Sequence, residues 1–414
     1  MVGDLISRRR GFLVGATNGG RTLDFSKAGP SWHDSRLEKR PWPSARNSCL
    51  LLSAYCLLPG FQRPFLVTDP TPNLDSFIHS LPKVELHLHL EGSVQPETLR
   101  ELSHHKSLLR REVGNWVSER RRQSFRYGNF QSFLKAFGVV TLLLKTPEDY
   151  ALATTRLMEW LKTQNVKYAE VIFSAGVVLW KKQSVEAVFE AISAAAADAE
   201  TRLGVRVRWI MDAIRHFGVE HVREVLGWAI RYRERGVVAF GIGGDEERGP
   251  AELFADIYRE AREAGLRLTA HAGEASGPES IRKAVELLGA ERIGHGLTAI
   301  QDPSVMALLR ERRIPLEVCP TSNVATGLIA RFEDHPLPRF LEAGLVVTLN
   351  SDDPAMFGTS LKNEFLQAAK IFSLTRQQIV GLCGNAIRFS FLPEGDKQQL
   401  LGELAEAGTE SLSQ

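Results

Sequence analysis

The chain has 414 residues, of which 43% are hydrophobic and 24% charged, and a formal net charge of +2 at pH 7. This is an ordinary globular composition, long enough for one large domain or two average ones. Residues 1–80 hold 10 basic and 6 acidic side chains, which leaves 41 basic and 43 acidic side chains in the rest of the chain. A body so close to neutral argues against nucleic acid or an anionic membrane as the main partner.

The first 72 residues lack the pattern of a folded domain, since they mix Arg, Gly, Pro and Ser with little periodicity. Arg9-Arg10 weakly resembles the start of a twin-arginine signal, but no apolar core follows it. The apolar run CLLLSAYCLL at 49–58 is too short to span a membrane. We therefore expect a poorly ordered extension over 1–72, a barrel domain over 73–400 and a C-terminal tail over 401–414.

The cysteines form no CxxC pair and show no framework spacing. Free thiols in a reducing compartment are the simplest interpretation, so we expect a cytoplasmic protein. The four are Cys49, Cys56, Cys319 and Cys383.

From Leu81 onward, short apolar runs alternate with longer amphipathic stretches such as 185–203 and 250–265. Strands that alternate with helices predict parallel βαβ units, and eight of them over about 310 residues suit a TIM (β/α)8 barrel. An open doubly wound sheet is the alternative, weakly supported because GIGGDE has Glu246 in place of the third glycine of a dinucleotide motif. The predicted strands are VELHLHL (84–90), YAEVIFS (168–174), VRVRWIMD (205–212), VVAFGIG (237–243), LRLTAHA (266–272), ERIGHG (291–296), IPLEVCP (314–320) and LVVTLNS (345–351).

The first of these strands carries two histidines at alternate positions. Residues two apart on a strand share one face, so His87 and His89 project together while Leu86, Leu88 and Leu90 cover the other face. Neutral imidazole is the commonest metal ligand, but two packed histidines would give the same pattern. This strand by itself leaves both interpretations open.

Chemically capable side chains gather where the predicted strands end, which is where TIM barrels place their active sites. Four of the 11 histidines lie at these ends. The strand-end residues are His87, His89, Gly243, Gly244, Asp245, His271, Glu274, His295, Asp352 and Asp353. Five histidines in the extension or in polar segments are expected to be solvated, namely His33, His104, His105, His221 and His335.

Residues from three strand ends can converge on one point in the barrel mouth. His87, His89, His271 and Asp352 offer three imidazoles and one carboxylate, a good ligand set for Zn²⁺ with room for a water molecule. The convergence favours a metal site where the histidine pair alone did not. The sequence therefore predicts one Zn²⁺ per chain.

These residues resemble the sequence boxes of the adenosine deaminase family, in the amidohydrolase superfamily, over roughly residues 75–395. Each short box is weak by itself, but their order and strand-end placement together are specific. The boxes are HLHLEG with its HxH, HAGE (271–274), GHG (294–296), SDDP (351–354) and CPTSN (319–323), the last similar to microbial members.

The resemblance implies hydrolytic removal of the 6-amino group of an adenosine-type nucleoside, releasing ammonia and the inosine-type product. Bound Zn²⁺ can lower the pKa of water to about 7. Asp352 would bind the metal and accept a hydrogen bond from the attacking water. His295 would take the water's proton or orient the water, and stabilise charge. Glu274, with its pKa raised by burial, would protonate ring N1.

The purine would be held by two further residues, with Asp353 hydrogen-bonded to N7 and the backbone N–H of Gly244 to N3. Helix capping or an ion pair is the structural alternative for Glu274 and Asp353. Two-metal amidohydrolases commonly use a modified lysine at the end of strand 4, and GIGGDE has none, which favours one metal. The H-x-E…P-C-x-x-C signature of nucleic-acid deaminases is also absent.

One departure concerns the sugar side of the pocket, where adenosine deaminases proper have HxHLDG and this chain has Glu91. The longer carboxylate makes adenosine, 6-aminodeoxyfutalosine and adenine competing substrates. DAIRHFG (212–218) and GIGGDEERGP (241–250) look most like the 6-aminodeoxyfutalosine branch, whose substrate carries a carboxybenzoyl group. Arg215 and His216 would then meet that carboxylate, or else cap a helix or face solvent. Residues 118–130 are either a lid or a solvated helix face.

Two other functional classes remain. A different metal-dependent amidohydrolase would cleave an amide or ester, although Glu274 placed to protonate a ring nitrogen argues against it. A non-catalytic nucleoside-binding barrel is expected to lack a metal ligand or the acid, and this chain has both.

Overall fold

The computed structural model describes residues 74–104 and 126–410. The predicted extension over 1–72 and residues 118–125 of the predicted lid lie outside the described residues. Within the described part, no helix combines the length and apolarity that a membrane crossing requires.

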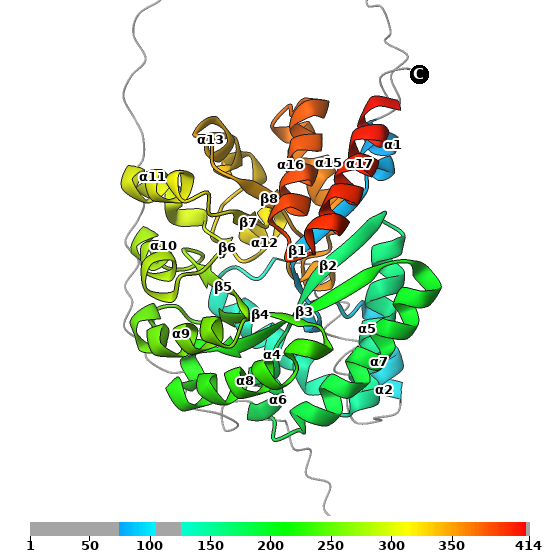
Figure 1. Ribbon diagram of the computed structural model, residues 1–414, viewed down its shortest axis with the longest axis vertical. Helices are drawn as coiled ribbons and strands as arrows, with labels where there is room; N and C mark the ends of the chain where they lie inside the picture. Colours follow the sequence, from blue (N-terminus) through cyan, green and yellow to red (C-terminus); the bar gives the residue numbers. More distant parts are fainter. Residues whose placement is uncertain (1–73, 105–125, 411–414) are drawn as a thin grey trace, which may run out of the picture. The chain divides into compact units, whose positions relative to one another are not determined.

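Eight parallel strands run side by side in chain order, β1 to β8 (Figure 1). The sheet closes where the backbone of Asp352, just after β8, pairs with β1, since His89 N donates to Asp352 O at 2.9 Å and Asp352 N to His87 O at 3.1 Å. The predicted TIM barrel is confirmed, and the open sheet is excluded. The strands are Lys83–His89, Val166–Phe173, Arg206–Ile214, Val237–Gly243, Arg267–Ala272, Arg292–His295, Leu316–Val318 and Val347–Leu349.

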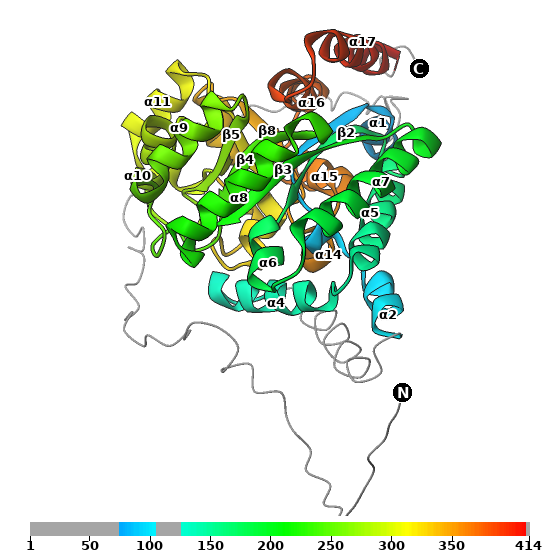
Figure 2. The ribbon, with the colours of Figure 1, turned by 60° about the horizontal axis from the view of Figure 1, so that its bottom comes forward.

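Helices cover the outside of the strands, and the local sequence explains where they begin and end (Figures 1 and 2). Helix α7 begins after Ser184, whose side chain accepts from Ala187 N, and ends at Gly204 in the left-handed conformation. The helices are α1 Leu74–Ser80, α2 Pro96–His104, α4 Phe130–Leu143, α5 Pro147–Lys162, α6 Ala175–Trp180, α7 Val185–Leu203, α8 Val219–Arg231, α9 Ala255–Glu263, α10 Pro278–Lys283, α11 Pro303–Glu311, α12 Pro320–Ala325, α13 Leu337–Glu342, α14 Pro354–Phe357, α15 Leu361–Ile371, α16 Arg376–Phe389 and α17 Glu394–Glu410.

Most predicted strand boundaries differ from the structure by one or two residues, and three differences have a clear local description. The seventh strand is shorter than 314–320 because Pro320 starts α12 directly after it. The 250–265 stretch begins with a 3₁₀ turn, Ala251–Phe254, before α9. The boundary predicted between the barrel and the C-terminal tail, at residue 400, falls inside α17, which continues to Glu410.

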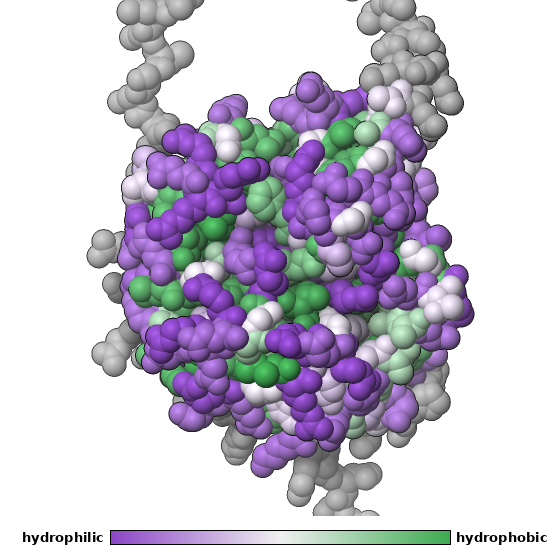
Figure 3. All heavy atoms as spheres, in the orientation of Figure 1, coloured by the Kyte–Doolittle hydropathy of each residue, from purple (hydrophilic) through white to green (hydrophobic). Residues whose placement is uncertain are grey.

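The apolar core lies between the strands and their covering helices, whereas the barrel interior is partly charged. Buried Glu170, Arg292 and Glu317 come from β2, β6 and β7. At the carboxyl end of β1, helices α4 and α14 contact the turn Glu91–Ser93, and Figure 2 shows them at one end of the barrel with α6. The face in Figure 3 is mostly hydrophilic, with hydrophobic side chains visible between the polar ones.

Candidate metal centre and active site

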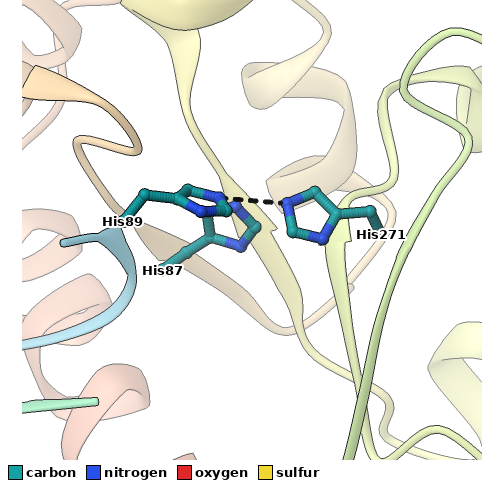
Figure 4. Close-up of side chains that lie close together, drawn as sticks. All are labelled: His87, His89 and His271. Atoms are coloured by element: carbon teal, nitrogen blue, oxygen red, sulfur yellow. Dashed lines mark hydrogen bonds between the residues drawn. The ribbon is translucent and has the colours of Figure 1, made fainter. Parts of the chain in front are cut away.

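Three histidines meet at the carboxyl end of the barrel (Figure 4), and one aspartate lies beside them. His87 and His89 lie on β1, His271 lies on β5, and Asp352 follows β8. His89 Nε2 is 3.3 Å from His271 Nε2 and 3.3 Å from Asp352 Oδ1, and His87 Nε2 is 3.5 Å from the same carboxylate oxygen. The four side chains predicted as ligands are therefore brought together and buried.

These separations fit one zinc ion. Two ligands on a tetrahedral zinc at 2.0–2.1 Å lie about 3.3 Å apart, which is the spacing found here. His87 Nε2 makes no hydrogen bond within the described residues, although it is buried. Burial alone would lower the pKa of His87, but the Asp352 and Glu317 carboxylates raise it to about 10. The carboxylates around His87 thus favour a positive charge at this position, and a bound metal cation would supply that charge.

Hydrogen bonds behind the ligands turn their Nε2 atoms toward the centre. His87 Nδ1 lies 2.9 Å from Glu317 Oε2, and His271 Nδ1 lies 3.3 Å from the carbonyl of Ile242. A neutral imidazole that donates from Nδ1 keeps its lone pair on Nε2, as metal binding requires. Ser322 Oγ donates to Asp352 Oδ2 at 2.7 Å, which leaves Oδ1 facing the histidines.

Glu317 is itself fixed by a buried ion pair with Arg292, whose Nε lies 2.5 Å from Glu317 Oε1 and whose Nη2 lies 2.5 Å from Glu170 Oε2. The sequence analysis missed this chain of charges. The available signal was a charged residue inside each of three predicted strands, Glu170 in YAEVIFS, Arg292 in ERIGHG and Glu317 in IPLEVCP.

Glu317→Gln is expected to weaken zinc binding by about 10- to 100-fold, the usual effect of losing an outer partner of a ligating histidine. Gln keeps the size of Glu but removes the charge that polarises His87. Competition with a chromophoric chelator measures the affinity. Glu311→Gln, on α11, is the control and should bind zinc as the wild type does; an unchanged affinity in Glu317→Gln would remove Glu317 from the site.

Two site residues have a backbone conformation that is unusual for non-glycine residues. His295 has φ of 62° and Asp352 also has φ of 62°. Such left-handed positions cost of order 1–3 kcal/mol and cluster at functional sites. Gly294 gives further room, since a Cβ there would lie 2.7 Å from His87 Cε1. The backbone at the ends of β6 and β8 therefore adopts unusual conformations next to the clustered histidines.

The predicted acid, Glu274, is buried beside His295, with Oε1 3.5 Å from His295 Nε2. Burial, with Asp352 and Glu246 nearby, raises the pKa of Glu274 well above 4.5, so its carboxyl keeps its proton to a higher pH than a free glutamic acid does. Glu246 holds the loop by accepting from Gly273 N at 2.8 Å and from the backbone N–H of Glu274 and Ala275 at 3.0 Å each. Glu246, which occupies the third glycine position of the dinucleotide motif, therefore positions the backbone of Glu274.

The proposed substrate residues lie beside the metal ligands. Asp353 is buried, and burial together with Asp352 raises its pKa well above 3.8. Its Oδ1 has no hydrogen-bond partner among the described residues. A Cβ on Gly92 would come within 1.6 Å of that oxygen, so glycine is required there. Gly244 has φ of 93°, and a Cβ on it would lie 2.7 Å from His216 Nδ1.

Glu91 is buried, accepts a hydrogen bond from Ser174 N at 3.2 Å, and has Oε2 without a partner among the described residues. Burial raises its pKa to about 7. A buried carboxyl oxygen with no partner is suited to a hydrogen bond with a ligand. Its position next to the HxH strand fits the predicted role at the sugar side.

Arg215 is buried beneath His271, donating from Nη2 to His271 O at 2.6 Å and from Nη1 to Gly249 O at 3.3 Å. These bonds use the end of the guanidinium, so a role in supporting His271 now competes with contact to a substrate carboxylate. His216 Nδ1 accepts from Asp245 N at 3.2 Å. Burial and Arg248 lower the pKa of His216 to about 4, so it is neutral.

Two histidines predicted to be solvated are not. His221 is half-buried, with Nε2 2.8 Å from Gly176 O. His335 is 3% exposed, because the packing of α12 and α13 encloses a segment that is polar in sequence. The sequence analysis also assigned no role to Asn323, whose Nδ2 lies 3.3 Å from His295 Nδ1. His33 and His105 lie outside the described residues.

A parallel barrel with a buried His3Asp centre, a buried glutamic acid of raised pKa and a second carboxyl beside it defines a metal-dependent aminohydrolase. The chain belongs to the adenosine deaminase family, whose model matches residues 82–407.

Three relatives differ in the adenine compound that gives each its name. The chain is 40% identical to the aminodeoxyfutalosine deaminase of Streptomyces avermitilis, over 80% of this chain and 92% of the relative. It is 35% identical to the adenine deaminase of Chlorobium luteolum, over 80% and 96%. It is 32% identical to the adenosine deaminase of Clostridium kluyveri, over 81% and 97%. Deamination of an adenine-type substrate is common to all three.

Solved structures agree on the fold. The adenine deaminase of Arthrobacter aurescens superposes with a TM-score of 0.74 at 32% identity, covering 79% of this chain and 98% of that one. An amidohydrolase of Burkholderia ambifaria, solved with bound Zn, gives a TM-score of 0.75 at 26% identity, covering 82% and 95%.

Proposed function

We propose that this protein is a deaminase that uses one Zn²⁺ per chain to remove the 6-amino group of an adenosine-type nucleoside by hydrolysis. The observation that carries the proposal is the buried cluster of His87, His89, His271 and Asp352 with buried Glu274, whose pKa is raised, at its edge. Zinc, when bound, makes water nucleophilic at neutral pH. The proposed partner is thus a small nucleoside substrate, and no nucleic acid or membrane takes part. We also propose a cytoplasmic location, where nucleoside substrates are found.

Each nearby side chain has a defined part in this reaction. Asp352 accepts a hydrogen bond from the attacking water, and His295 contacts the same water. Glu274 gives its proton to purine N1, so that C6 becomes more electrophilic. Protonated Asp353 donates to N7, and the backbone N–H of Gly244 donates to N3.

For the particular substrate we propose 6-aminodeoxyfutalosine ahead of adenosine and adenine, because the relative at 40% identity is an aminodeoxyfutalosine deaminase. Side-by-side kcat/KM measurements on the three compounds test this choice. A preference of tenfold or more for adenosine, or for adenine, would replace it. If the absorbance at the adenine band falls with none of the three compounds, the result would instead support the non-catalytic barrel or an amide-cleaving enzyme.

Glu91→Asp is expected to shift kcat/KM toward plain adenosine and to lower it for 6-aminodeoxyfutalosine. The shorter side chain restores the HxHLDG pattern and withdraws the carboxyl group from a substituted 5′ position. The ratio of the two kcat/KM values is the measurement, which is independent of the active enzyme fraction. An unchanged ratio would mean that Glu91 does not distinguish substrates by their 5′ substituent.

Arg215→Ala distinguishes the two roles left for this residue. Because the guanidinium donates to the backbone of His271, we expect kcat/KM to fall by similar factors for 6-aminodeoxyfutalosine and adenosine. Loss of a charge-assisted bond to a substrate carboxylate would instead cost about 1.5–3 kcal/mol, or about 10- to 150-fold, for 6-aminodeoxyfutalosine alone. That selective loss would restore the substrate-contact hypothesis.

A further inference from the structure

A chain of buried hydrogen bonds runs from His295 away from the active site. His295 Nδ1 lies 3.3 Å from Asn323 Nδ2, and Asn323 Oδ1 lies 3.2 Å from His335 Nε2. The chain ends at the backbone, where Leu337 N donates to His335 Nδ1 at 3.1 Å. All three side chains are at most 3% exposed.

The backbone end of this chain fixes the direction of every bond in it. A peptide N–H can only donate, so His335 Nδ1 accepts, and the proton of the neutral ring lies on Nε2. His335 is neutral because burial lowers its pKa to about 3. The Nε2–H then donates to Asn323 Oδ1, which turns the amide NH2 toward His295. Asn323 therefore donates to His295 Nδ1.

The other side of His295 agrees with this direction. Its Nε2 points into the site, 3.5 Å from Glu274 Oε1 and 3.8 Å from Asp352 Oδ2, and both of these oxygens can accept a hydrogen bond. A hydrogen on Nε2 would face the carboxylate oxygen of Asp352, which is favourable. A lone pair on Nε2 would face the same negative charge, which is unfavourable. Ser322, one residue before Asn323 on α12, donates to the same Asp352 oxygen, so α12 supports both His295 and Asp352.

We propose that Asn323 and His335 are positioning residues that keep His295 Nδ1 as a hydrogen-bond acceptor, so that the ring proton lies on Nε2. His295 then donates a hydrogen bond into the site and has no lone pair facing the attacking water. With the proton on Nε2, His295 orients the attacking water and does not remove its proton. This inference rests on the proposed function. Neither positioning residue contacts the metal or the reacting atoms.

The test is a long-range ¹H–¹⁵N correlation spectrum of the zinc-loaded full chain labelled with ¹⁵N-histidine. His295→Gln identifies the His295 signals by their loss. We expect Nε2 of wild-type His295 to be protonated. Asn323→Asp replaces the donor with an acceptor, so the proton should move to Nδ1. A wild-type Nδ1–H tautomer would overturn the proposal.

Two substitutions at one position separate hydrogen bonding from packing. His335→Gln keeps an N–H donor near the Nε2 position, whereas His335→Asn is too short to reach Asn323. We expect His335→Asn to lower kcat by roughly tenfold or more with little change in KM, and His335→Gln to recover most of it. His221→Asn should leave the His295 signals and kcat unchanged. Equal losses in both His335 variants would show a packing role and overturn the relay.

The two proposals fail in different ways. If no adenine compound is deaminated but the tautomer responds as expected, the proposed function is wrong and the positioning of His295 stands. If deamination is found and the tautomer does not respond to Asn323→Asp, the positioning proposal is wrong and the function stands.

Discussion

His271→Ala is expected to lower the zinc content from about one ion per chain to nearly none and to abolish turnover. His271 supplies one of three Nε2 atoms, and its loss leaves two imidazoles and one carboxylate, a weaker ligand set for Zn²⁺. The barrel should stay folded, because a large apolar core does not depend on one metal ion in the way that a zinc finger does. Elemental analysis and circular dichroism of the same sample measure the two effects.

His221→Ala is the matched control, since it removes a half-buried histidine outside the metal cluster. It should keep zinc and turnover. Two tightly bound ions per wild-type chain, both needed for activity, would contradict the single-metal assignment. Full activity in His271→Ala would remove the metal from the mechanism altogether.

The metal ligands could be predicted because each depends on a local pattern joined to one rule of the fold. Alternation placed His87 and His89 on one face of a strand, and the TIM barrel brings strand ends together. The structure confirms the barrel and brings His271 and Asp352 to the same point.

The supporting residues could not be predicted, because their roles depend on packing between distant segments. Glu317 pairs with Arg292 of the neighbouring strand β6, and only the closure of the barrel brings Glu317 to His87 on β1. His335 lies among polar neighbours in the sequence, yet α12 and α13 bury it. Boundaries failed for a local reason at Pro320, where a helix starts inside the predicted strand.

Glu274→Gln is expected to keep zinc and to lower kcat by roughly 10²-fold or more, the usual effect of removing a general acid. Gln has the size of Glu and can still accept a hydrogen bond, but it has no proton to give to N1. Glu279→Gln makes the same change on α10 at an exposed position and should leave kcat unaltered. Near-wild-type turnover in Glu274→Gln would make Glu274 a structural residue of the loop that Glu246 holds.

The pH dependence gives an independent check on the same residue. An acid acts only while it is protonated, and burial raises the pKa of Glu274 well above 4.5. The proton is therefore kept to a higher pH than on a free carboxyl and is lost as the pH rises through the raised pKa, so kcat/KM should fall on the alkaline side of that pKa. In Glu274→Gln the part of that decline caused by Glu274 should disappear, whereas a residue that only shapes the loop would leave the alkaline decline in place.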